Sequence, residues 1–167
     1  MTKKIAVFPG SFDPFTNGHL DTVLRASRLF DEVVVAAMTN TSKQPLFSSE
    51  EKLALIAAST ADLPNVKAVA APKRLTVEFA KSIGAQFIIR GIRNVADFGY
   101  EADIATVNHD LDSQIETVFL LADKQYDALS STIIKEVTAF GGDIHRFVPA
   151  PVEEALYKKL GEPHQTN

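Results

Sequence analysis

Residues 4–19 read KIAVFPGSFDPFTNGH, and this stretch decides the fold. Its first part, Lys4–Phe8, is a short apolar run that predicts a buried strand. A loop containing Gly10 follows, and apolar residues then recur at helical spacing, which predicts a helix over Gly18–Phe30. A buried strand that leads through a loop directly into a helix is the repeating unit of an α/β fold.

The same alternation continues along the rest of the chain. Further strands are predicted over Val33–Met38, Val66–Ala70, Phe87–Arg90 and Thr117–Leu121. Further helices are predicted after the capping box Ser48–Glu51, over Thr76–Ile83 with Gly84 closing it, and over Tyr100–Leu111, Ser130–Phe140 and Pro151–Leu160. Because the strands are continuous apolar runs, we expect an α/β fold with a Rossmann-like parallel five-stranded sheet, in the order 3-2-1-4-5, with helices on both faces. We expect a single domain over residues 1–161 and a loose C-terminal tail over residues 162–167.

Composition limits the classes of function. The chain has 167 residues, of which 46% are hydrophobic and 23% charged, and this is typical of one globular domain with its own core. A net charge of −4 argues against a nucleic-acid binder that works through a broad basic face. The lack of cysteine excludes disulfides and thiolate zinc sites, and it fits a reducing, cytoplasmic setting. No apolar run reaches the roughly 18 residues of a membrane span, and the N-terminus lacks the apolar core of a signal peptide.

The glycines exclude two common phosphate-binding loops. No glycine is followed by Lys-Ser/Thr as in a Walker loop, and the first strand is not followed by G-x-G-x-x-G. Instead, Gly10 allows a sharp turn off the strand, and Gly18 leaves open space where the helix begins. His19 is then expected in the first helical turn, where free N–H groups favour an anion. The alternative interpretation is that both glycines only form turns and that His19 is a surface residue.

Two further segments suggest phosphate contacts. Arg90-Gly91-Ile92-Arg93 follows the fourth strand, and guanidinium groups suit bidentate contacts with phosphate. If strands one and four are neighbours, these arginines meet Ser11 and His19 at the carboxyl edge of the sheet. The run Ser130–Thr132 places hydroxyls at the start of the helix after strand five, beside the same edge. The alternatives are a pair of solvated arginines and an ordinary helix N-cap.

Two short motifs carry a resemblance to a known superfamily. The sequence TNGH, Thr16–His19, resembles the (His/Thr)-x-Gly-His signature of nucleotidyltransferases, and LSSTIIK, Leu129–Lys135, resembles their Ile-Ser-Ser-Thr-x-x-Arg signature. The longer segments PGSFDPFTNGH, Lys43 near PLF, IIRGIRNVADFGYE and LSSTIIKEV resemble the bacterial phosphopantetheine adenylyltransferase family. This resemblance runs over nearly the whole chain in order and spacing.

The resemblance implies a set of functional residues. Catalysis would involve His19, Ser11, Lys43 and Arg93. ATP would be bound by Ser11, Phe12, His19, Gly91, Ile92, Arg93, Glu101, Tyr126, Asp127, Ala128, Leu129, Ser130, Ser131 and Thr132. The phosphorylated substrate would be bound by Ser11, Lys43, Thr76 and Arg90. Taken alone, Lys43 could equally be a solvated loop lysine, and Glu101 an ordinary residue of a first helical turn.

The resemblance also implies the reaction and its partners. The family transfers AMP from ATP to 4′-phosphopantetheine and releases dephospho-CoA and pyrophosphate, a step of coenzyme A biosynthesis. Mg²⁺ would be carried by ATP, coenzyme A would act as a feedback inhibitor, and the assembly would be a homohexamer. The chain departs from the family at Lys135, where the superfamily signature has Arg, at Thr76, and at Tyr126–Ala128.

The remaining polar residues suggest no protein nucleophile and no dedicated metal site. There is no evident Ser-His-Asp arrangement, so direct in-line attack without a covalent enzyme intermediate is expected. His109, His145 and His164 are interpreted as ordinary helix, strand and tail residues. Two other functions stay open: a nucleotidyltransferase acting on nicotinate mononucleotide or glycerol phosphate, and a nucleotide sensor without turnover.

Overall fold

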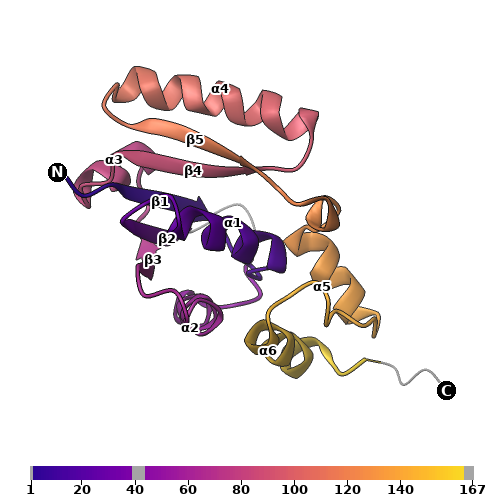
Figure 1. Cartoon of the computed structure of the whole chain (residues 1–167). Coiled ribbons are helices and arrows are strands. Elements are labelled where there is room, and N and C mark those ends of the chain that lie inside the picture. Colours follow the sequence, from indigo (N-terminus) through magenta and orange to yellow (C-terminus); the bar gives the residue numbers. More distant parts are fainter. Residues whose placement is uncertain (1, 39–43, 164–167) are drawn as a thin grey trace.

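A five-stranded, all-parallel sheet forms the centre of the molecule. The computed structural model describes residues 2–38 and 44–163. The strands are β1 (Ile5–Gly10), β2 (Glu32–Met38), β3 (Val66–Ala71), β4 (Phe87–Ile92) and β5 (Glu116–Leu121). Their order is β3-β2-β1-β4-β5 (Figure 1), which confirms the predicted topology.

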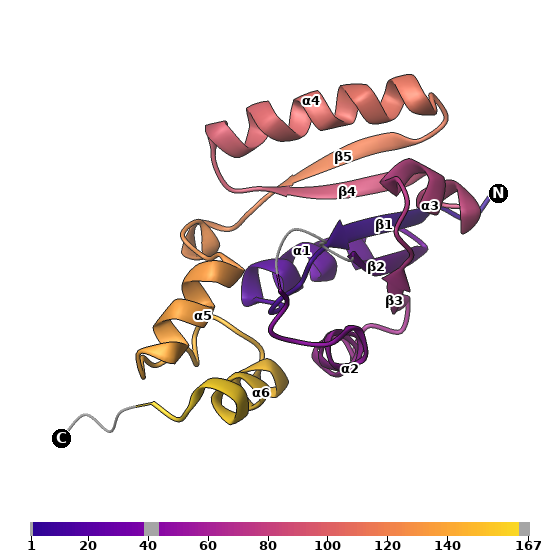
Figure 2. The same ribbon diagram turned by 180° about the vertical axis from the view of Figure 1, so that it is seen from behind.

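Helices follow each strand and cover the sheet from both sides (Figures 1 and 2). They are α1 (Asn17–Ser27), α2 (Ser49–Ser59), α3 (Thr76–Ser82), α4 (Val95–Leu111), α5 (Ser131–Ala139) and α6 (Ala150–Leu160), with a short 3-10 helix over Lys124–Tyr126. Successive strand residues point to opposite faces, so one sheet feeds two cores. The predicted single α/β domain with helices on both faces is confirmed.

The larger core lies under α1, α2, α5 and α6. It contains Phe8 and Val35 from the strands, together with Ile56 of α2, Ile134 of α5 and Leu156 of α6. The second core, on the opposite face, joins Val7, Val34 and Ile88 of the strands to Val77 and Phe79 of α3. Both cores contain residues of β1 and β4, the two strands at the centre of the sheet.

Capping residues in the sequence predicted most helix ends correctly. Ser48 and Glu51 form the predicted capping box at the start of α2, and Gly84 follows α3 with φ of +70°. The predicted Tyr100 start of α4 is wrong, because Asn94 caps the helix by accepting the backbone N–H of Asp97. Other predicted boundaries agree with the observed ones or differ from them by at most three residues.

Two smaller expectations need correction. β4 continues through Gly91 to Ile92, so the first arginine of the Arg90–Arg93 motif lies within the strand and does not follow it. His145 lies in a turn before α6 and not in a strand, because its backbone N–H bonds to the Asp143 side chain. His109 lies in α4 as expected, and His164 falls outside the described residues.

None of the helices within residues 2–38 and 44–163 combines the length and the apolar character that crossing a membrane requires.

Candidate active site

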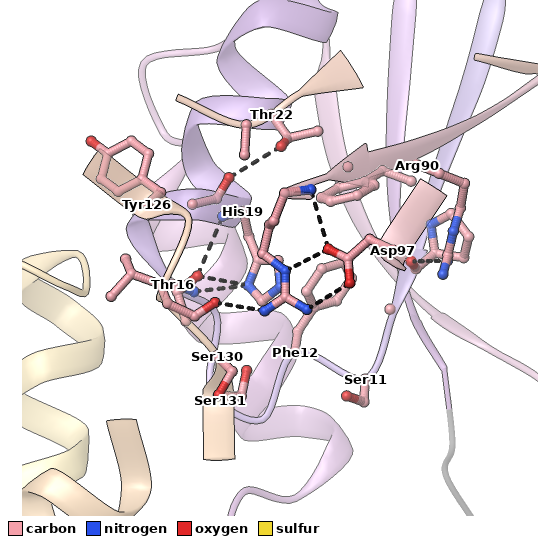
Figure 3. A pocket seen from close by; sticks show the side chains of 18 of the residues that line it. Ser11, Phe12, Thr16, His19, Thr22, Arg90, Asp97, Tyr126, Ser130 and Ser131 are labelled. Atoms are coloured by element: carbon pink, nitrogen blue, oxygen red, sulfur yellow. Dashed lines mark hydrogen bonds and ion pairs between the residues drawn. The ribbon is translucent and has the colours of Figure 1, made fainter. Parts of the chain in front are cut away.

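A cavity of about 320 Å³ opens at the carboxyl ends of β1 and β4 (Figure 3). The strand order reverses between these two strands, and ligands of open α/β sheets bind at such a position. The lining comes from the loop after β1, the start of α1, the end of β4, α4, and the segment that leads into α5. Both signature segments, Thr16–His19 and Leu129–Ser131, therefore reach the same cavity.

His19 stands in the first turn of α1 and is tied to its N-cap. The backbone N–H of Thr16 donates to His19 Nδ1 at 3.0 Å, and the His19 backbone N–H donates to Thr16 Oγ1 at 3.3 Å. This reciprocal arrangement is a capping box. Because Nδ1 accepts a hydrogen bond, the proton of the neutral ring is on Nε2, which is left as a donor for a ligand.

Aromatic rings surround the His19 imidazole. Phe15 stacks on it with centroids 5.6 Å apart, and Phe12 meets it edge-on at 5.1 Å. Burial lowers the pKa of His19 to about 4, and the positive charge of Arg93 acts in the same direction. At neutral pH the ring is therefore an uncharged donor and not a cation.

The loop between β1 and α1 depends on a close approach at Gly10. A Cβ atom at this position would lie 2.8 Å from the ring of Phe12, so the site requires glycine. Phe12 has φ of +44°, which is unusual for a residue with a side chain, and its ring is buried in the aromatic cluster. Ser11 stays exposed beside the ring and lines the cavity.

Arg90 reaches the cavity from β4 in a fixed orientation. Its Nε and Nη2 donate to the two oxygens of Glu101 on α4 at 2.6 and 2.5 Å, and Nη1 donates to the Pro9 carbonyl at 3.3 Å. Glu101 is only 9% exposed. This bidentate pair holds the guanidinium rigid, and its other N–H groups have no partner among the described residues, so they can bind an anion.

Arg93 connects the end of β4 to the segment before α5. It donates from Nε to Asp97 Oδ2 at 2.9 Å and from Nη1 to the Leu129 carbonyl at 3.1 Å. The hydrogen bond from Arg93 holds the pKa of Asp97 below its usual value. Asp97 lines the cavity and was not predicted as a site residue; it stands in the first turn of α4, four residues after Arg93, which precedes the helix.

The start of α5 supplies hydroxyl groups to the same cavity. Ser130 is the N-cap of α5 and accepts the backbone N–H of Ile133 at 3.2 Å. It is therefore an ordinary N-cap residue and also lines the cavity. The Ser131 hydroxyl donates to the Pro14 carbonyl at 2.8 Å, which joins α5 to the loop after β1. Tyr126 closes this side, with its Cβ close to the position that a side chain at Gly18 would occupy.

The structure brings together most, but not all, of the predicted site residues. The cavity is lined by Ser11, Phe12, His19, Arg90, Gly91, Arg93, Glu101, Tyr126, Leu129, Ser130 and Ser131. Thr132 lines a second, adjoining cavity. Neither cavity is lined by Thr76, Ile92, Asp127 or Ala128, and Lys43 lies outside the described residues. Thr16 and Gly18 also line the main cavity as part of the predicted signature segment, whereas Thr22 and Ala122 line it and were not predicted.

The carboxylates among the described residues of the cavity do not form a metal site of their own. Among residues 2–38 and 44–163, no group of three or more His, Cys, Asp or Glu side chains could hold a metal ion. The two carboxylates that line the main cavity, those of Asp97 and Glu101, are each bound by an arginine.

Comparison with known proteins defines the class first. Residues 7–137 match the family model described as cytidylyltransferase-like. The fold is similar to that of a putative nicotinate-nucleotide adenylyltransferase from Vibrio parahaemolyticus, with a TM-score of 0.70, 20% identity, and coverage of 93% of this chain and 99% of that one. The protein is a nucleotidyltransferase.

Closer relatives identify the family. A phosphopantetheine adenylyltransferase of Lacticaseibacillus paracasei is 90% identical over 166 residues, which cover 99% of both chains. One from Latilactobacillus sakei is 57% identical over 160 residues, covering 96% of this chain and 97% of the relative. The chain belongs to the bacterial phosphopantetheine adenylyltransferase family, which confirms the resemblance found in its sequence.

Proposed function

We propose that this protein transfers the adenylyl group of ATP to 4′-phosphopantetheine, giving dephospho-CoA and pyrophosphate. The family assignment supports this reaction. The observation that carries it is the single cavity lined by His19, Arg90, Arg93 and the start of α5, because these groups suit two phosphate-bearing substrates.

The proposed chemistry is direct in-line displacement without a covalent enzyme intermediate. An oxygen of the 4′-phosphate attacks the α-phosphorus of ATP, and a new P–O bond forms. The bond from this phosphorus to the oxygen that bridges to the β-phosphate breaks, so pyrophosphate leaves with that oxygen. Positioning and charge stabilisation then supply the catalysis. His19 donates its Nε2–H to an oxygen of the α-phosphate, where negative charge develops in the transition state.

The proposed roles of the other residues follow the family pattern. Ser11, Lys43 and Arg93 assist His19 around the reacting phosphates. The adenosine and triphosphate of ATP contact Ser11, Phe12, Gly91, Ile92, Arg93, Glu101 and Tyr126–Thr132. The 4′-phosphopantetheine contacts Ser11, Lys43, Thr76 and Arg90. Since the Arg90 guanidinium is held by Glu101, it meets the 4′-phosphate with little loss of side-chain freedom.

Mg²⁺ enters with ATP in this proposal. Its oxygen ligands would be phosphates and water, because Asp97 and Glu101 are already engaged by arginines. When bound, the ion neutralises charge on the triphosphate. Arg93 and the hydroxyls at the start of α5 orient the same phosphates through hydrogen bonds.

We also propose that the protein assembles as a homohexamer and that coenzyme A inhibits it in the same cleft. Support for assembly comes from α4, a 17-residue helix with large apolar side chains exposed on it. Val95 is 87% exposed, and Phe98, Tyr100, Val107 and Leu111 are each at least half exposed. Large apolar side chains exposed in this number on one helix are typical of a surface covered by another chain. Sedimentation of the purified protein measures the assembly.

Release of pyrophosphate tests the reaction. The protein is mixed with ATP and Mg²⁺ and then given 4′-phosphopantetheine, unphosphorylated pantetheine, nicotinate mononucleotide or glycerol phosphate. We expect release with 4′-phosphopantetheine alone among these acceptors. Binding of ATP without any release would identify a nucleotide sensor, and a faster reaction with another phosphorylated acceptor would overturn the assignment of the substrate.

A further inference from the structure

A second cavity, of about 210 Å³, adjoins the main one and shares Ser11 and Ser131 with it. Three charged side chains line it, namely Asp13, Lys52 and Lys135. The reaction proposed above uses none of them. Asp13 nevertheless has only 7% of its surface exposed, so its charge needs compensation from within the protein.

The Asp13 carboxylate joins three segments that are distant in the sequence. Its Oδ1 accepts the backbone N–H of Phe47 at 2.9 Å, and its Oδ2 accepts the backbone N–H of Leu46 at 2.9 Å. Oδ2 also accepts from Lys135 Nζ on α5 at 3.1 Å, and Lys52 Nζ of α2 lies 3.9 Å from Oδ1. The loop after β1, the stretch before α2, and α5 are therefore connected through one side chain.

Asp13 belongs to the loop that shapes the main cavity. Ser11 and Phe12 precede it directly, and the Phe12 ring packs edge-on against His19. Pro14 follows it and accepts the hydroxyl of Ser131. A displacement of Asp13 therefore shifts residues on both sides of the reacting phosphates.

The ionisation of Asp13 allows its carboxylate to form an ion pair with Lys135. Burial by itself raises the pKa of Asp13, but the hydrogen bonds from Leu46, Phe47 and Lys135 outweigh burial and leave the pKa below its usual value. The carboxylate is charged at neutral pH. Lys135 lines the second cavity and not the main one, and its ammonium group is bonded to Asp13.

We infer that Asp13 and Lys135 are a positioning pair for the transfer reaction. Their ion pair fixes the loop of Ser11 and Phe12 against the start of α5, and so aligns the two signature segments around the triphosphate. Neither side chain needs to touch ATP. This inference rests on the proposed function, because the pair acts on the alignment that the reaction needs.

Kinetics of single and double variants test the pair. We expect Asp13→Asn and Lys135→Met each to lower kcat about tenfold, in line with a sub-ångström misplacement, with the ATP KM changed by less than about twofold. The double variant should be no slower than the slower single variant, since both substitutions break one connection. Lys135→Arg should keep most of the activity, because it keeps the charge.

A matched pair on the surface provides the control. Lys81 Nζ lies 2.9 Å from Asp112 Oδ2, and Asp112 also accepts the backbone N–H of Gln114, so the bonding resembles that of Asp13. Lys81 and Asp112 line neither cavity. Asp112→Asn and Lys81→Met should therefore leave kcat unchanged. Thermal unfolding of every variant shows that the compared proteins are folded.

Three kinetic results would overturn the inference. These are wild-type kcat in both pair variants, multiplied losses in the double variant, or an ATP KM that rises about tenfold in Lys135→Met but not in Asp13→Asn. The last result would make Lys135 a direct ligand of the phosphates. If Asp13→Asn does not fold, the contrast between Lys135→Met and Lys135→Arg decides, and equal kcat in these two variants would overturn the pair.

Amide hydrogen exchange tests the same pair without turnover. Exchange of the amides in residues 11–16, and of Leu46 and Phe47, should be faster in both pair variants than in the Lys81 and Asp112 controls. Unchanged exchange would overturn the positioning role even if the wild-type protein released no pyrophosphate. Absence of wild-type release with faster exchange in the variants would instead reject the proposed function alone.

Discussion

His19→Ala removes one neutral hydrogen-bond donor from the reacting centre. Nδ1 of the ring is occupied by the Thr16 N–H at 3.0 Å, which leaves Nε2–H for the substrate. With a pKa of about 4, only about one ring in a thousand is charged at pH 7. The substitution therefore deletes a dipole, and the net charge of the site stays the same.

The expected loss follows from this assignment. Removal of one preorganised donor to a transition-state oxyanion lowers kcat by about 10² to 10³, equivalent to about 2.7–4 kcal/mol. The ATP KM should change much less, because the bond strengthens only in the transition state. His19→Ala also removes the half of the capping box in which the Thr16 N–H donates to the ring, and the loss of this hydrogen bond costs about 0.5–1.5 kcal/mol of stability.

His19→Gln separates these two effects. Glutamine at the third helical position forms the same capping box with a threonine N-cap, and its amide N–H keeps a donor on a more flexible side chain. Initial rates of pyrophosphate release at saturating substrates, with thermal unfolding of each variant, are the measurements. Stability should return in His19→Gln, while kcat should recover only in part because the amide donor is less rigidly held.

Two results would refute this reasoning. An unchanged turnover number in both variants would remove His19 from the mechanism. A wild-type kcat that titrates with a pKa near 6.5 and loses this dependence in His19→Gln would show that the ring acts as a general acid or base and not as a neutral donor.

Three other properties of the protein can be predicted from named contacts. Arg90→Lys should weaken the binding of 4′-phosphopantetheine much more than the binding of ATP, as measured by calorimetry. Lysine cannot keep the bidentate contact with Glu101 and also present two N–H groups to a phosphate, and equal losses of affinity for both ligands would contradict this prediction. Gly10→Ala should lower the free energy of unfolding in urea by about 1–3 kcal/mol through the 2.8 Å clash with Phe12, whereas Gly99→Ala, with open space around its Cβ position, should not. The free energy of unfolding of the wild-type protein should fall as the pH is lowered from 6.5 to about 4, because the unfolded chain binds a proton at His19 that the folded protein excludes. In His19→Gln, the free energy of unfolding should depend less on pH over this range.

The sheet could be predicted because its central strands are mostly buried on both faces. Continuous apolar runs such as Val33–Met38 predict parallel and not antiparallel pairing of the strands, and the observed strand order agrees with the predicted one. The start of α4 was harder to predict. Its apolar residues lie all around the helix, with Val95 and Tyr100 largely exposed, so the periodicity does not mark where the helix begins.

The site was predictable only where a local motif carries it. Thr16–His19 and Ser130–Ser131 were found because each is a helix start with a distinctive sequence, and the structure brings both to one cavity. Asp13 and Lys135 are 122 residues apart, and nothing in either local sequence indicates the other. The bidentate pair of Arg90 and Glu101 depends in the same way on how α4 packs beside β4.

The charge balance of the cavity bears on the proposed reaction, in which an acidic protein handles two anionic substrates. Among the described residues that line it, Arg90 is matched by Glu101 and Arg93 by Asp97, while His19 is neutral. The lining therefore offers directed N–H and O–H donors with no net charge of its own. Such donors stabilise charge that develops at a fixed point, but they provide only a weak general attraction for an anion. In the proposed reaction, an arrangement of this kind favours the transition state over tightly bound pyrophosphate, and it leaves neutralisation of the triphosphate to the ion that ATP would bring with it.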